Sequence, residues 1–169
     1  DRAAITIRNS TFFNNYANRG HSGGDEANDG RGGGGGIFVV GGSLLVNSST
    51  FNNNQTGEFT TGVGGLGGGA IVVLERDGES ASLILRNTIL AGNGPYECYV
   101  RGDVTVSGTA NLITDNSANS RADSPCPGVA ASADPQLESL ALDPVIGRTP
   151  TMKIPLTSPA MDNADVSTS

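Results

Sequence analysis

The side chains best suited to chemistry lie in residues 16–32, a glycine-rich stretch that interrupts a regular pattern. This stretch carries three carboxylates and a neighbouring cation: Asp25, Glu26, Asp29 and Arg31. Hard carboxylate oxygens on such a loop are typical Ca²⁺ ligands. Paired carboxylates also serve as acid and base in polysaccharide cleavage, where an arginine would neutralise a uronate. A solvated loop that keeps an acidic protein soluble is the interpretation that we favour. Of the two acidic groups in the sequence, this one is the better functional candidate, because a long insertion into a regular pattern needs a reason.

A second acidic group surrounds the dipeptide Asp77-Gly78, which is typical of a tight turn. Its carboxylates alternate along the chain as Glu75, Asp77 and Glu79. This group is the second candidate site for Ca²⁺. The alternative is a charged hairpin tip in solvent.

Ser22 lies in a Gly-x-Ser-x-Gly match, which resembles the nucleophile elbow of α/β-hydrolases. That elbow needs a strand before it, a helix after it and a separate histidine as base. Here Asn-rich and Gly-rich segments flank the motif, and His21, the single histidine of the chain, adjoins the serine. An adjacent histidine is badly placed to accept the serine proton. Serine esterase chemistry at Ser22 is therefore a remote alternative.

Composition excludes several classes of protein. The 169 residues carry 17 acidic and 10 basic side chains, a net charge of −7, which argues against nucleic acid and anionic membranes as partners. No apolar stretch reaches the roughly 18 residues needed for membrane insertion, and no signal peptide is visible. Because the chain starts at Asp1 and alternates in polarity from Ala4, we expect that an N-terminal part of a larger protein is missing.

A repeat of 39 residues is the strongest signal in the sequence. The block from Asn9 to Phe12 returns as residues 48–51 and again as residues 87–90, and an alternating strand precedes each copy. The compact unit, residues 33–54, has about the length of one turn of a β-solenoid. The register predicts that apolar side chains stack in two internal columns: Phe12, Phe51 and Leu90 in one, and Ile7, Val46 and Leu85 in the other.

Aromatic side chains are few, at 5% of the chain, so a glycan-binding groove has thin support. The pattern assigns Phe38 to the core together with Phe12 and Phe51. It places the remaining candidates in loops: Tyr16, Phe59, Tyr96 and Tyr99.

The Gly-rich tracts and the segment from Leu44 to Asn54 resemble the repeats of bacterial surface and secreted proteins with a right-handed parallel β-helix. The C-terminal part carries motifs in the order found in "choice-of-anchor Q" proteins: Asn87 to Asn93, Cys98, Asn111 to Ile113, Cys126, Asp134 to Leu137, and Leu156 to Asp162. The resemblance implies an all-β, right-handed parallel β-helix (a β-solenoid) with Gly-rich loop insertions, at the cell surface or secreted. These motifs are structural, so they imply a fold and not an activity.

Two domains are expected: β-helix coils over residues 1–115, with last strands at 104–106 and 111–113, and an irregular cap with an extended tail over residues 116–169. The two cysteines cannot form a zinc site with one histidine. In a secreted protein a disulfide between Cys98 and Cys126 is expected, and it would tie the tail to the last coil.

Solenoid ends expose unpaired strand edges, so a homodimer through the uncapped N-terminal coil is expected, with Ile5, Ile7, Phe12 and Phe13 in the interface. The leading function is a non-catalytic structural or adhesive module of an exported bacterial surface protein, with a polysaccharide or cell-surface glycan as candidate partner. The alternative is a carbohydrate-active β-helix enzyme, a polysaccharide lyase or glycoside hydrolase, that uses the carboxylates of loop 16–32.

Overall fold

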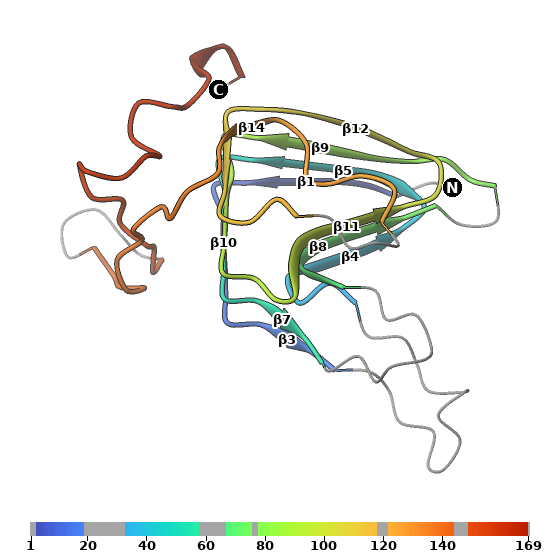
Figure 1. Cartoon of the computed structure of the whole chain (residues 1–169), viewed down its shortest axis with the longest axis horizontal. Helices are drawn as coiled ribbons and strands as arrows, with labels where there is room; N and C mark the ends of the chain where they lie inside the picture. The colour runs from blue at the N-terminus through green and yellow to red at the C-terminus, as the bar shows by residue number, and fades with distance from the viewer. Residues whose placement is uncertain are drawn as a thin grey trace.

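The computed structural model describes residues 3–18, 33–57, 67–75, 78–117, 122–143 and 149–168 (Figure 1). Within these ranges the fold is all-β with parallel sheets, and the regular non-strand element is a short 3-10 helix, Val166–Thr168. No helix in the described ranges is long and apolar enough to cross a membrane.

Three parallel sheets carry the fold, and each of the first three repeats contributes one strand to each of them. The first sheet has the order β1-β5-β9-β12, formed by Ala4–Arg8, Gly42–Asn47, Ala81–Arg86 and Val104–Thr109. The second has the order β14-β13-β10-β6-β2, formed by Val129–Ala131, Asn111–Ile113, Ile89–Ala91, Thr50–Asn52 and Thr11–Phe13. The third has the order β11-β8-β4, formed by Tyr96–Arg101, Gly68–Leu74 and Ile37–Val40. A short pair, β3 (Tyr16–Ala17) with β7 (Gln55–Thr56), lies at one corner (Figure 1).

The strand register confirms the repeat predicted from the sequence. Val46 pairs with Ile7 on one side and with Leu85 on the other, while Phe51 pairs with Phe12 and with Leu90. Bonds between neighbouring repeats join residues 39 positions apart, as predicted. The last step is shorter, at 23 residues, since Thr88 bonds to Asn111. The predicted last strands, 104–106 and 111–113, lie within β12 and β13.

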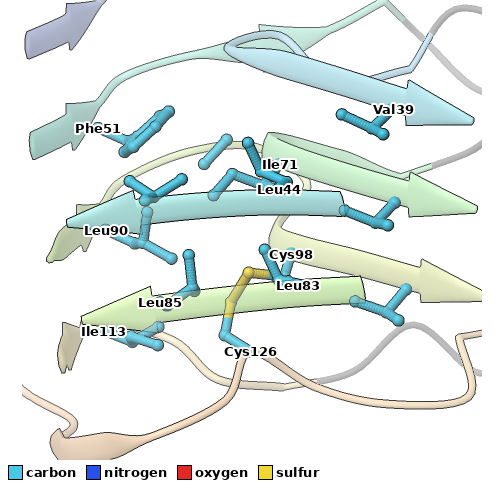
Figure 2. Packing of buried hydrophobic residues seen from close by; sticks show 14 of the residues in the cluster. Val39, Leu44, Phe51, Ile71, Leu83, Leu85, Leu90, Cys98, Ile113 and Cys126 are labelled. Atoms are coloured by element: carbon cyan, nitrogen blue, oxygen red, sulfur yellow. A yellow bond between two sulfur atoms is a disulfide. The ribbon is translucent and has the colours of Figure 1, made fainter. Parts of the chain in front are cut away.

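Inward-facing side chains of the three sheets form one core (Figure 2). Leu44, Leu83, Leu85, Leu90 and Phe51 are at most 1% exposed. The rings of Phe12 and Phe51 are parallel, with centroids 4.5 Å apart. The residues of each predicted column are therefore confirmed as neighbours on adjacent strands.

Four aromatic assignments were wrong, and Phe59 lies outside the described residues. Tyr16 and Tyr96, predicted to be in loops, are the first residues of β3 and β11. Phe38, predicted to be core, is 43% exposed, because its strand turns Val39 inward instead. Tyr99, predicted to be in a loop, lies in β11 and is fully buried against Val72, on the side of the third sheet that faces away from the main core. A continuous apolar run does not reveal which alternate residues face inward, so the error follows from the sequence signal itself.

Backbone packing explains the glycine tracts before β4 and β8. A Cβ atom on Gly69 would lie 2.4 Å from the backbone nitrogen of Gly94 and 2.6 Å from the carbonyl oxygen of Asn54. On Gly36 it would lie 2.7 Å from the carbonyl oxygen of Ala70. Neighbouring repeats therefore approach each other here more closely than any side chain allows.

The C-terminal part is less irregular than expected, because β14 extends the second sheet in parallel with β13. Beyond β14 the chain runs along the outer side of this sheet, where Leu137 and Ala160 pack on Ile89 and Ala91. Near the C-terminus, Asp165 and Asn87 form two reciprocal hydrogen bonds. The backbone N–H of Asp165 donates to Asn87 Oδ1 at 2.7 Å, and Asn87 Nδ2 donates to the backbone carbonyl of Asp165 at 3.1 Å.

Candidate functional site

The candidate residues of the 16–32 loop lie outside the described residues. These are His21, Ser22, Asp25, Glu26, Asp29 and Arg31, and Asp77 of the second acidic group is also outside them. The Ca²⁺, carbohydrate and esterase hypotheses that depend on them stay predictions.

Of the second acidic group, Glu75 and Glu79 are described. Glu75 Oε1 accepts a 2.7 Å hydrogen bond from the backbone N–H of Gly78, so this carboxylate stabilises the turn. Nearby, Asp123 Oδ2 accepts a 2.7 Å bond from the backbone N–H of Gly102. In the described part of the chain, no three His, Cys, Asp or Glu side chains are arranged to hold a metal ion.

The most distinctive polar arrangement is a column of asparagines between the second and third sheets. Asn54 Oδ1 accepts two bonds from Asn15, 3.1 Å from its backbone nitrogen and 2.7 Å from Nδ2. One repeat further, Asn93 Oδ1 accepts the same pair from Asn54, at 2.9 and 2.8 Å. Asn54 and Asn93 are at most 6% exposed. Each carboxamide thus joins its repeat to the next, as in a side-chain ladder.

The asparagine ladder ends on a carboxyl group, Glu97. Asn93 Nδ2 donates to Glu97 Oε2 at 2.5 Å, and the backbone N–H of Asn93 lies 3.4 Å from Oε1. Glu97 therefore accepts the two donors that a further asparagine would accept. At 2% exposed, its side chain is removed from solvent, and this burial raises the pKa of Glu97 to about 7. The hydrogen bonds from Asn93 and Gly92 act in the opposite direction, and the charge of Asp115 adds a smaller increase.

A buried carboxyl with a raised pKa is the usual mark of a general acid or base. Here the carboxyl group of Glu97 accepts hydrogen bonds from the backbone N–H and the side-chain amide of Asn93. At 2% exposed, it is too buried to contact a substrate. Its chemistry is to hold or release a proton inside the fold. The sequence analysis missed Glu97, although the Asn15, Asn54 and Asn93 spacing was visible and a ladder needs a terminus.

The predicted disulfide is confirmed: Cys98 of β11 is bonded to Cys126, with Cα atoms 5.4 Å apart (Figure 2). Both residues are 3% exposed and belong to the main core. Asn116 holds the Cys126 segment through two further bonds, 3.0 Å from its Oδ1 to the backbone nitrogen and 3.2 Å from its Nδ2 to the carbonyl oxygen.

Comparison with known proteins gives no match to a family model, a curated protein or a solved structure.

Proposed function

We propose that the chain is a non-catalytic structural or adhesive module of an exported bacterial surface protein. In this proposal each repeat forms one coil of a right-handed parallel β-helix. A chain whose successive repeats return in parallel register to the same sheets supports this architecture, because such a chain winds about one axis.

The observation that carries the proposal is the set of hydrogen-bond partners of the buried polar side chains. A catalytic site needs polar groups directed at a substrate, whereas Asn54 and Asn93 bond one repeat to the next, and Glu97 bonds to Asn93 of its own repeat. Among the described residues, Thr56 Oγ1 is the buried side-chain polar atom that lacks a hydrogen-bond partner. Buried polar side chains that form hydrogen bonds within the fold are typical of a structural protein.

Export is supported by the disulfide. A bond between buried cysteines persists in oxidising compartments and is rare in the cytosol. A surface location further predicts that an antibody raised against the chain labels intact cells of the source bacterium without permeabilisation. Labelling that appears only after permeabilisation would contradict it.

The proposal is tested by a polysaccharide binding screen with and without Ca²⁺, followed by assays for reducing ends and for unsaturated products. The expected result is no product above that of heat-denatured protein, whether or not a glycan binds. Product that disappears in the triple variant Asp25→Asn, Glu26→Gln, Asp29→Asn, at unchanged melting temperature, would establish the carbohydrate-active enzyme instead. Hydrolysis of a p-nitrophenyl ester that is lost in Ser22→Ala would establish the esterase.

A further inference from the structure

The chain beyond β14, called here the C-terminal tail, lies on the outer side of the second sheet (Figure 1). Between the tail and the sheet lies a slot with a volume of about 120 Å³. Its floor is the row of Ile89, Leu112 and Ala131, which are neighbours on the adjacent strands β10, β13 and β14. The tail lines the slot from the other side with these residues: Ile154, Pro159 and Ala160. The slot therefore lies within the contact between the tail and the sheet.

The part of the tail that lines the slot between residues 159 and 164 is fixed at both ends. Just before it, Ser158 Oγ donates a 2.6 Å hydrogen bond to the backbone carbonyl of Pro135, and Ser158 is buried. Just after it, the backbone N–H of Asp165 donates to Asn87 Oδ1 at 2.7 Å. Because both ends are bonded to their partners, this segment bridges the slot and does not collapse onto the sheet.

Small side chains keep the slot open. Its lining includes five alanines from the sheet, its corner and the tail: Ala110, Ala130, Ala131, Ala160 and Ala164. Protein interiors are close-packed, and an unfilled void costs stability because its lining loses contacts. A void that the fold holds open between two anchored layers is the usual form of a pocket for a ligand.

The lining determines which ligand the slot can take. None of the described side chains that line it is charged. Thr88 Oγ1 donates to the carbonyl of Arg86 at 2.8 Å, and Asn111 Nδ2 donates to the carbonyl of Leu85 at 2.9 Å. The Asn87 amide is bonded to the tail. A water molecule in the slot needs two to four polar partners, and these side chains are already engaged, so an apolar occupant is favoured.

We propose that this slot is a binding site for a small uncharged apolar group, an aromatic ring or a short alkyl group, held between Ala160 of the tail and Leu112 of the sheet. Its volume is close to the roughly 150 Å³ of an apolar cavity that accepts benzene in another protein. An occupied slot would also hold the tail more firmly on the sheet, because the ligand contacts both. This inference goes beyond the proposed module function and does not depend on it.

The test is a titration of the 169-residue chain with benzene, followed by the methyl NMR signals of its alanines. We expect saturable shifts at Ala131, Ala160 and Ala164, with a dissociation constant on the order of 1 mM. Ala141 of the tail does not line the slot, and its signal should not move. Pyrimidine has the same ring shape with two nitrogen acceptors, so its dissociation constant should be about tenfold higher or more, because these acceptors would lose their bonds to water.

Ala160→Leu should raise the dissociation constant for benzene about tenfold or more, because the longer side chain fills the slot. Ala141→Leu is the matched control: it adds the same side chain at an exposed position of the same tail, and the variant should bind benzene like the parent. Circular dichroism shows whether each variant is folded. If Ala160→Leu fails to fold, Ala164→Leu decides, because Ala164 lines the slot from an exposed position.

The absence of saturable shifts at the three slot alanines overturns the inference. Equal affinity for benzene and pyrimidine overturns the apolar chemistry of the site. A folded Ala160→Leu or Ala164→Leu variant that binds benzene like the parent would place the ligand elsewhere and overturn the inference as well.

Discussion

Asn93 donates its side-chain amide to Glu97 across 2.5 Å, and this contact ends a ladder whose other members are a full repeat apart. A carboxyl group occupies the position of the next carboxamide. The two groups have similar shape, but a carboxyl can ionise, so the last contact of the ladder depends on pH.

Stability should fall as pH rises through neutrality. The pKa of Glu97 is about 7 in the fold against an ordinary value of 4.5, so between these values the folded chain binds more protons than the unfolded chain. The contribution is therefore complete below about pH 4.5 and is lost as the carboxyl ionises near pH 7. The shift corresponds to about 2–4 kcal/mol of unfolding free energy.

Urea unfolding of the parent chain and Glu97→Gln, at about pH 5 and about pH 8.5, measures this effect. Glu97→Gln should remove most of the decrease, since an amide does not titrate. Glu138→Gln, at an exposed glutamate of the tail, should keep it. An equal decrease in Glu97→Gln and the parent would show that another group is responsible.

Phe51→Ala should destabilise the fold by about 3–5 kcal/mol, because Phe51 is fully buried and its removal leaves a cavity between Phe12 and Leu90. Phe13→Ala is the control from the same kind of strand: Phe13 is 38% exposed, and its truncation should cost far less. Denaturant unfolding gives both values. A loss below about 0.5 kcal/mol for Phe51→Ala is the size expected of a surface position, and it would contradict the internal column.

Gly69→Ala should destabilise the fold by about 1–3 kcal/mol or more, since the added methyl group meets the backbones of Asn54 and Gly94, which cannot rotate away. Gly94→Ala is the matched variant, because its Cβ would meet one atom, the Cγ of Gln55, at 3.9 Å. The melting temperatures of the two proteins make the comparison. Equal values would mean that the repeats do not approach as closely as we describe.

Intact protein denatured without reductant should show no alkylatable thiol from Cys98 or Cys126. The double variant Cys98→Ala, Cys126→Ala should lose about 3–4 kcal/mol, because the bridge closes a loop with a sequence separation of 28 residues. Hydrogen exchange should rise more in the segment around Cys126 than in β5 and β9, whose core does not depend on the bridge. A uniform rise would show that the disulfide holds the whole stack.

The repeat, the two apolar columns and the disulfide partners could be predicted because each rests on spacing or on a count. Equivalent residues 39 positions apart must stack if the repeats stack, so Phe12, Phe51 and Leu90 follow from the sequence. Two cysteines leave one intramolecular pairing. The acidic and serine candidates were found from residue types and a short motif, which do not fix what a side chain contacts. Of those that the structure describes, Glu75 bonds to the backbone of Gly78.

The sequence by itself determined the all-β class and the register of the first two sheets over the first three repeats, since these follow from short-range alternation and the 39-residue period. The tertiary structure decided the features that depend on contacts outside the period. It turned Phe38 outward and buried Tyr99, and it brought Asp165 to Asn87, 78 residues away. It also placed Glu97 beneath Asn93, where loss of solvent raises the pKa of the carboxyl. Burial and desolvation are properties of the packed chain, so no local pattern reveals them.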